Sequence, residues 1–308
     1  MRHDWRGPSL ILGAAALWST GGLGIKSLDL FPLTTAGWRS VFALAALLAV
    51  GGWRALTGAA LKRRAVLGTA ASYALTLVLF VSATRLTTAA NAILLQYTSP
   101  LWVIALSHVF PHERPRARDY AVASGCLAGL ALFFMDRVST EGLWGMLLAI
   151  ASGLTMACLI VGLRHEGLRG AQSSSTAAVL LGNGLCILMC SPWMASGFAE
   201  VSAANWTVIG SLGVFQLGLP YILFSRGLRQ VTALQATLLG LIEPLLNPFW
   251  VWLGTGERPG PWANVGGGII ILCLVVDLFT RRSPVPAEDG PPPAEADSEK
   301  IESSRTGT

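Results

Sequence analysis

Residues 85–115 read RLTTAANAILLQYTSPLWVIALSHVFPHERP, and residues 229–259 read RQVTALQATLLGLIEPLLNPFWVWLGTGERP. At a shift of 144 residues, eleven of these 31 positions are identical without a gap. Apolar composition repeats Leu and Ala by chance, but it does not also align Arg85 with Arg229, Pro100 with Pro244, and both Glu-Arg-Pro motifs. The chain therefore contains an internal duplication, and the duplication determines how the rest of the sequence is interpreted.

Each copy is an apolar segment of helix length with a proline near its middle. A proline removes a backbone donor and clashes with the carbonyl one turn earlier, so it kinks or breaks a helix. Interrupted apolar segments at corresponding places in two halves of a chain point to the binding site of a transporter. The repeat thus suggests both a membrane fold and the location of its site.

The composition is that of an integral membrane protein. Of the 308 residues, 53% are hydrophobic and 13% are charged, and the mean hydropathy is +0.57. A soluble domain carries about a quarter charged residues. The net charge of +5 does not indicate nucleic acid, because the Lys and Arg residues lie in short loops between apolar runs. The five cysteines lie inside apolar runs and predict neither disulfides nor a metal site. We expect no cofactor.

Ten apolar segments approach the roughly 20 residues that a helix needs to cross the hydrocarbon core. The sequence therefore predicts an all-α integral membrane fold. The first segment resembles a signal peptide, but its length and the short gap before the second favour a retained helix. The segments are 9–27, 32–52, 65–84, 88–110, 119–136, 141–163, 174–194, 206–225, 231–253 and 261–280.

The loop charges predict the orientation. With the N-terminus inside, seventeen Lys and Arg residues fall on the cytoplasmic side and five on the outer side. We expect the inner membrane of the cell, with both termini cytoplasmic. Since the repeat unit has five helices, an odd number, the two halves have opposite orientations and form an inverted repeat. The predicted parts are an N-terminal segment 1–8, repeats 9–136 and 141–280, and a disordered cytoplasmic tail 283–308 rich in Pro, Glu and Ser.

Several motifs carry a family resemblance. They are Trp18-Ser19, Trp38-Arg39-Ser40, Gln96-Tyr97-Thr98-Ser99-Pro100, Glu113-Arg114-Pro115, Glu243-Pro244 and Glu257-Arg258-Pro259, with Lys26 near the end of the first helix. Over residues 9–280 the chain resembles the drug/metabolite transporter superfamily, specifically its ten-helix EamA-type exporters. Within that group, the aromatic amino acid exporters look nearest. The resemblance implies a secondary transporter and leaves the substrate open.

Glu243 and Arg39 are the charged side chains of greatest interest inside the spans. Glu243 lies near the middle of segment 231–253, where a charge is costly and marks a functional site by default. It could anchor a substrate ammonium, carry a proton, or pair with Arg39 to lock helices together. Arg39, about two turns into the second helix, could face a substrate carboxylate, form an inner ion pair, or snorkel to the interface. A structural lock is slightly favoured for Arg39.

The prolines at corresponding depths, and Pro248 one turn later, predict breaks that border a cavity, because free backbone groups are tolerated at depth only there or inside protein. Side chains that could contact a substrate are aromatic, amide, hydroxyl or acidic groups in these spans. About half of them are expected to touch it. The residues are Trp18, Tyr73, Gln96, Tyr97, Ser99, Trp102, Phe215, Tyr221, Glu243, Asn247 and Trp250; the break residues are Pro100, Pro244 and Pro248.

Small residues recur at equivalent places in the last helix of each half, as Gly125 and Gly129 and as Gly266, Gly267 and Gly268. They predict close helix contacts, either within one chain or at a dimer seam. The sequence leaves the monomer and the homodimer open. We expect the lipid bilayer and a small-molecule substrate to be its partners.

The leading hypothesis is a secondary transporter that exports small amphiphilic metabolites by alternating access at a midplane site. Amino acids, aromatic ones among them, are the first substrate class. The alternative is export of other metabolites or drugs by proton antiport. An intramembrane enzyme is a remote alternative, because His3, His112 and His165 lie in loops or at the terminus and His108 stands alone near a helix end. A channel fits poorly, since it would need rings of charge or carbonyl groups.

Overall fold

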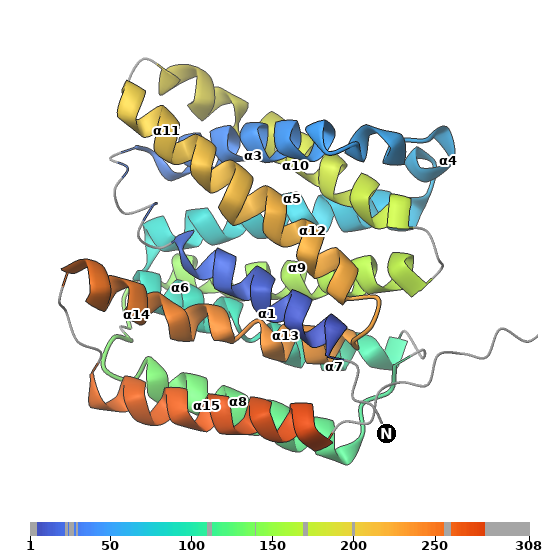
Figure 1. Ribbon diagram of the computed structural model, residues 1–308. Helices are drawn as coiled ribbons and strands as arrows, with labels where there is room; N and C mark the ends of the chain where they lie inside the picture. Colours follow the sequence, from blue (N-terminus) through green and yellow to red (C-terminus); the bar gives the residue numbers. More distant parts are fainter. Residues whose placement is uncertain are drawn as a thin grey trace, which may run out of the picture.

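The computed structural model describes residues 5–21, 24, 28, 30–109, 113–138, 140–168, 172–198, 201–255 and 260–280. In this part of the chain all regular structure is helical (Figure 1). The predicted tail 283–308, Lys26, and the second Glu-Arg-Pro motif lie outside the described residues, as do the side chains of Asn247 and Pro248. The predicted repeat boundaries, 9–136 and 141–280, stay predictions.

The helices of the first half correspond in order to the first five predicted spans. They are α1 (Arg6–Ser19), α3 (Pro32–Ala49), η1 (Gly52–Ala55), α4 (Gly58–Leu61), α5 (Arg64–Leu86), α6 (Ala89–Gln96), α7 (Ser99–Val109) and α8 (Ala117–Phe133). The fourth span is thus made of two helices, α6 and α7, and the short η1 and α4 form a connection.

The second half follows the same order. Its elements are α9 (Leu143–Leu168), α10 (Gln172–Ser196), α11 (Ala203–Ser211), the π-helical η3 (Leu212–Gly218), α12 (Leu219–Gly227), α13 (Ala233–Leu239), α14 (Ile242–Thr255) and α15 (Pro261–Thr280). The ninth span is again made of two helices, α13 and α14.

Six described segments have the length and hydropathy to cross a membrane: α3, α5, α9, most of α10, the run from α11 through α12, and α15. The other spans are shorter apolar pieces: α1, α6 with α7, α8, and α13 with α14. The fold predicted from the sequence, ten membrane helices in two repeats of five, is confirmed. The protein is a multi-pass membrane protein.

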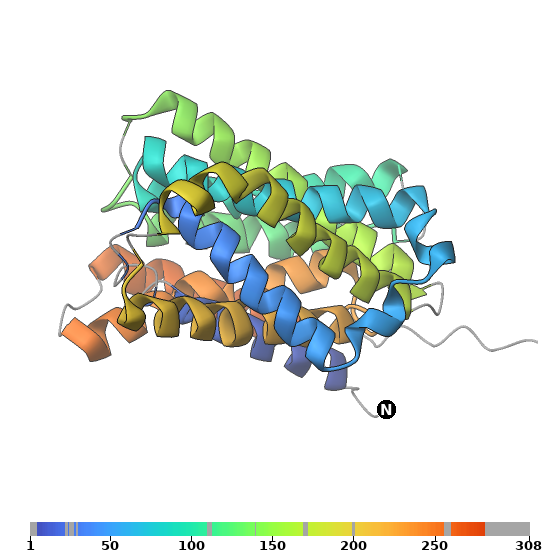
Figure 2. The same ribbon diagram turned by 90° about the horizontal axis from the view of Figure 1, so that it is seen from above.

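The packing follows the repeat. The long contact of α5 with α9 has its counterpart in that of α12 with α1, and the contacts of α6 and α7 with α9 recur as those of α13 and α14 with α1. The pairs α3–α10 and α8–α15 each join corresponding helices of the two halves. Figures 1 and 2 show the helices side by side as one bundle, with the start of α1 and the end of α15 at the same end. Such exchange of equivalent contacts is the geometry of an inverted repeat.

Identical residues of the repeat have identical structural roles where the interrupted helices begin. Thr88 precedes α6, and its hydroxyl oxygen accepts a bond from the Asn91 backbone N–H at 3.1 Å. Thr232 precedes α13 and accepts from the Gln235 N–H at 3.2 Å. Each threonine satisfies one of the amides that a helix start leaves unpaired, which is why both copies keep it.

Both interruptions come just before a proline. Between α6 and α7 the chain turns at Tyr97 and Thr98, ahead of Pro100, and between α13 and α14 it turns at 240–241, ahead of Pro244. At each turn a backbone hydrogen bond spans three residues instead of the four of an α-helix. The Thr98 N–H donates to the Leu95 carbonyl at 3.2 Å, and the residue-241 N–H donates to the residue-238 carbonyl at 3.0 Å. The helix expected to break at Pro248 continues through it, since a proline removes only one backbone donor.

Glycine lets α9 approach the first interruption closely. A Cβ atom on Gly153 would lie 2.7 Å from the carbonyl oxygen of Gln96 and 3.2 Å from that of Leu95. Such a distance is impossible for a real side chain, so only glycine permits this approach. The backbone carbonyls at this turn are therefore covered by protein.

Glycine also brings α8 against α15. A Cβ atom on Gly129 would lie 2.9 Å from the Gly266 carbonyl oxygen, and the two helices pack along their length. Near one end, Arg118 of α8 forms an ion pair with the buried Asp277 of α15, with Nη2 and Oδ1 2.9 Å apart. The glycine contacts predicted from the sequence thus include one within the chain. Gly268 has open space around it.

Candidate functional site

The two interrupted helices are joined in the core by one hydrogen bond. Tyr97, at the turn between α6 and α7, donates from its hydroxyl to Glu243 Oε2 at 2.6 Å. Glu243 lies in the first turn of α14, just beyond the other interruption. Tyr97 is buried, whereas Glu243 is partly exposed. The carboxylate thus has a neutral hydrogen-bond partner, and the residue as a whole is partly exposed.

Arg39 of α3 is buried near this carboxylate without pairing with it. Its Nη2 donates to Gln216 Oε1 of η3, and Gln216 Nε2 in turn donates to the Trp18 carbonyl at 3.2 Å. The buried Nε of Arg39 has no hydrogen-bond partner among the described residues. Arg39 and Glu243 interact electrostatically through space, but no ion pair in the described ranges joins them. Arg39 therefore connects α3 to η3 through a hydrogen bond to a neutral amide, and not through an ion pair with Glu243.

Aromatic rings lie between α1, α5 and α12. The rings of Trp18 and Tyr221 meet edge to face at 5.2 Å, and those of Tyr73 and Tyr221 are 4.7 Å apart. Tyr73 also donates to Asn183 Oδ1 of α10 at 3.3 Å. Both tyrosines lie in the neighbourhood of the Arg39 guanidinium. The result is an apolar wall next to placed polar groups, which is the composition of a small-molecule site.

Other predicted residues make polar contacts elsewhere in the core. Trp250 of α14 donates from its indole to Ser19 Oγ of α1 at 2.8 Å. Gln96 donates to Ser152 Oγ of α9 at 2.8 Å, and Ser152 donates to the Thr76 carbonyl at 3.0 Å. Gln96 therefore joins α6 to α9 through the N–H of its side-chain amide.

Three predicted residues, Phe215, Ser99 and Trp102, stand apart from this group, and a fourth cannot be placed. Phe215 is 59% exposed, whereas its neighbour in η3, Gln216, is buried. The hydroxyl of Ser99 and the indole nitrogen of Trp102 are buried without a hydrogen-bond partner among the described residues. Asn247 lies in α14, but its side chain is outside the described part. The structure thus brings together Trp18, Tyr73, Tyr97, Tyr221, Glu243 and Arg39.

The two halves of the chain match the same protein family. The model of the EamA-like transporter family matches residues 5–135 and again 143–278, so one family unit covers each half. The chain belongs to the EamA-like transporter family.

Relatives of this transporter carry the same type of name. An uncharacterized transporter of Archaeoglobus fulgidus is 30% identical over 213 residues, which cover 69% of this chain and 76% of the relative. The uncharacterized transporter YxxF of Bacillus subtilis is 24% identical, and the match spans 62% of each chain. The pseudopaline exporter CntI of Pseudomonas aeruginosa is 27% identical over 63% of this chain and 67% of its own length.

A solved structure supports the fold of the transporter. It superposes with a TM-score of 0.73 and 20% identity, covering 90% of this chain and 98% of the solved one. At that identity the likeness concerns the fold alone. In the described ranges of this transporter, no three His, Cys, Asp or Glu side chains cluster as metal ligands would.

Two polar residues of the transporter's core, Gln216 and Asn183, were missed by the sequence analysis. Both are buried amides in apolar spans, which is itself a signal, because a polar group at such depth needs a partner. The repeat offered a second signal, since the 144-residue shift carries Arg39 onto Asn183. Arg39 of the first half binds Gln216 in the third span of the second half. Asn183 of the second half binds Tyr73 in the third span of the first half.

Proposed function

We propose that this transporter exports small amphiphilic metabolites that carry both an ammonium and a carboxylate, with amino acids, aromatic ones included, as the first class. One observation carries the proposal. Glu243 and Arg39 have opposite charges and lie in one cluster in the core of the bundle, yet each is held by a neutral partner instead of by the other. Charged groups at such depth are costly and are retained for function by default.

The chemistry of the cluster suits a zwitterion. The carboxylate of the partly exposed Glu243 can accept bonds from a substrate ammonium while it keeps the Tyr97 hydroxyl. The Arg39 Nε, which has no partner among the described residues, can donate to a substrate carboxylate. Charge-assisted bonds of this type are about twice as strong as neutral ones. The rings of Trp18 and Tyr221 offer edge-to-face contacts to an aromatic or aliphatic side chain.

The transport cycle that we propose is alternating access. The two repeats would rock against each other around the cluster and expose it to one side at a time. The end of the bundle that carries most Lys and Arg would face the cytoplasm, and the inner membrane would hold the protein with both termini cytoplasmic. The gradient of the substrate would drive net export, ahead of proton coupling, because Glu243 is the one acid that the sequence places at mid-span.

Counterflow in proteoliposomes tests the proposal. Purified protein is reconstituted, vesicles are loaded with one unlabelled amino acid, and uptake of labelled amino acids is followed. We expect exchange of zwitterionic amino acids and much weaker exchange of their N-acetyl and methyl ester derivatives, which each lack one charge. Equal exchange of the free and the blocked compounds would overturn it.

A second candidate, proton antiport of other metabolites or drugs, rests on the Tyr97–Glu243 hydrogen bond. A carboxyl group that shares a short bond with a phenol can hold or release a proton without moving its backbone. Uphill accumulation of a substrate driven by a pH gradient alone, in the same vesicles, would favour this candidate over gradient-driven exchange.

A further inference from the structure

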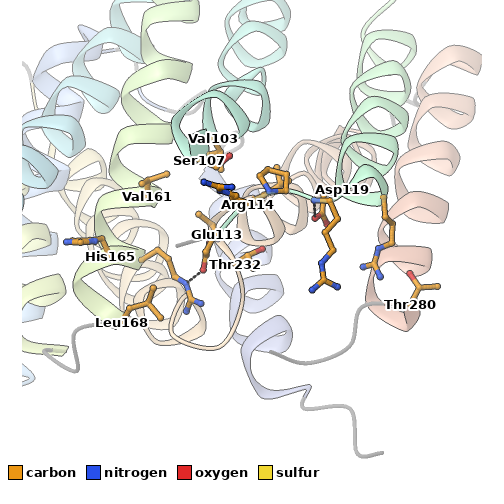
Figure 3. Close-up of a pocket in the computed structure, with 16 residues that line it drawn as sticks. Val103, Ser107, Glu113, Arg114, Asp119, Val161, His165, Leu168, Thr232 and Thr280 are labelled. Carbon is orange, nitrogen blue, oxygen red and sulfur yellow. Dashed lines mark hydrogen bonds and ion pairs between the residues drawn. The ribbon is translucent and has the colours of Figure 1, made fainter. Parts of the chain in front are cut away.

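A second polar feature lies away from the core cluster, at the arginine-rich end of the bundle. A cavity of about 630 Å³ opens there between α7, α8, α9, the start of α13 and the end of α15. Figure 3 shows Glu113 and Thr232 in its middle, with His165 and Leu168 to one side and Asp119 and Thr280 to the other. None of the residues of the proposed substrate cluster lines this cavity. The cavity is therefore a separate feature of the molecule.

On the inner wall of the cavity, the charges of Arg164 and Glu113 compensate each other. Arg164 Nε donates to Glu113 Oε1 at 2.6 Å, and Arg164 Nη1 donates to the Leu228 carbonyl at 2.6 Å. The second oxygen of Glu113 accepts from the Ala233 backbone N–H at 2.9 Å. These contacts use both oxygens of Glu113, so this carboxylate is not a free negative charge in the cavity.

The other charges near the cavity are also paired, with two exceptions. Asp119 accepts from the Arg116 backbone N–H at 2.8 Å, and Arg118 is bound to Asp277. Arg114 and Arg116 are exposed residues that line the cavity and form no ion pair in the described ranges. Asp277 compensates Arg118 and Glu113 compensates Arg164, so Arg114 and Arg116 against Asp119 leave a surplus of one positive charge.

The remaining lining is of two kinds. Thr232 accepts from the Gln235 N–H, so its own hydroxyl hydrogen can still be donated to a ligand oxygen. Val103, Val161 and Leu168 provide an apolar surface beside the polar one. A ligand that fills this cavity therefore has an anionic, oxygen-rich end and an apolar end.

We propose that this cavity binds the phosphate of an anionic lipid headgroup. Guanidinium groups match phosphate oxygens in geometry as well as in charge. Basic pockets between membrane helices are suited to anionic headgroups. The apolar residues would take the first carbons of the acyl chains, and the cavity lies where the helices end, at headgroup level. A soluble phosphate compound has the same recognition chemistry without the acyl chains.

Native mass spectrometry of the full-length protein in detergent tests the site with two lipids, dioleoyl phosphatidylglycerol and dioleoyl phosphatidylcholine. The variant Arg114→Gln with Arg116→Gln removes both free charges. Its matched control is Arg54→Gln with Arg226→Gln, two exposed arginines at the same end that do not line the cavity. At about 1 kcal/mol for each basic residue, the cavity variant should bind phosphatidylglycerol about thirtyfold more weakly, and the control should bind it like the wild type.

The outcomes separate the sources of phosphate. Preference for phosphatidylglycerol over phosphatidylcholine that is lost only in the cavity variant supports a lipid site. Displacement of the lipid by millimolar glycerol phosphate, with glycerol phosphate retained by the wild type alone, assigns the same site to a soluble phosphate. Equal phosphatidylglycerol binding by the wild type and the cavity variant overturns the proposal. The four replaced side chains are exposed, and thermal melting confirms that both variants are folded.

Discussion

The two interrupted helices of this transporter share a scaffold and differ in chemistry. Each begins behind a capping threonine, Thr88 or Thr232, and each turns just before a proline at the same depth. The 144-residue shift, however, carries Ser99 onto Glu243 and Tyr97 onto a leucine. The Tyr97–Glu243 bond thus joins positions that do not correspond. Both halves thus share the interruption, whereas the phenol occurs in one half and the carboxylate in the other.

The largest effect on one interrupted helix alone is expected at the start of α13. There the Ala233 N–H donates to Glu113, and Glu113 is paired with Arg164. We expect Arg164→Leu to lower the free energy of unfolding by about 2–3 kcal/mol, because it leaves the Glu113 carboxylate without its cation. This is less than the 3–5 kcal/mol of a fully buried pair, since the Glu113 side chain is 20% exposed. Thermal or denaturant unfolding in detergent measures it. Arg54→Leu, at an exposed position, is the control, and equal stability of the two variants would contradict the expectation.

The chemical difference between the helices is tested by Glu243→Gln against Ser99→Ala. We expect Glu243→Gln to weaken substrate binding by about 1.5–3 kcal/mol, or roughly ten- to a hundredfold, because a charged hydrogen-bond partner is lost. Ser99→Ala should leave binding unchanged, since the Ser99 hydroxyl is buried without a partner in the described structure. Concentration-dependent counterflow, normalised to folded protein, measures both. Similar losses in the two variants would mean that the halves are chemically equivalent.

The first interruption depends on the close approach of α9. Gly153→Ala should destabilise the protein by about 1–3 kcal/mol, because the new methyl group would overlap the Gln96 carbonyl. Gly184→Ala is a matched control in the middle of α10, where a Cβ would meet open space. Alanine should there be neutral or slightly stabilising, since it favours helix. If both variants unfold at the same temperature, α9 does not approach the turn as closely as described.

The shared part of the scaffold is tested by Thr88→Ala and Thr232→Ala. Each should cost about 1 kcal/mol of stability, because each removes the acceptor of one helix-start amide. The two losses should be equal within error, and serine at either position should restore most of the stability. A large loss at one cap with none at the other would show that the interrupted helices are not equivalent even in their scaffold.

Most of the fold could be predicted from the sequence because the bilayer restricts the choices. Spans must be helical, must be long enough to cross the hydrocarbon core, and must leave their charges in the loops. The repeated Thr, Pro and Glu-Arg-Pro then aligned the halves, and the odd number of helices in the unit predicted their inversion. The prolines indicated where the fourth and ninth spans would be interrupted.

The partners within the site could not be predicted, because they depend on how each helix is rotated about its axis. A span that is apolar on all sides gives no periodic signal for its buried face. Phe215 and Gln216 are neighbours in the sequence, yet Phe215 is exposed and Gln216 is buried against Arg39. The π-helical turn that contains both was not expected either, since it changes the residue spacing on which such a prediction would rest.

The contact of α8 with α15 has a mechanical consequence. Gly129 and Gly266 bring the two backbones together with no side chain between them, and the Arg118–Asp277 pair ties the same helices near one end. One helix belongs to each repeat, so this seam holds the two halves together at close range. In the alternating-access cycle proposed above, the repeats would rotate about the line of this seam. The displacement of any residue would then grow with its distance from the line of contact between α8 and α15.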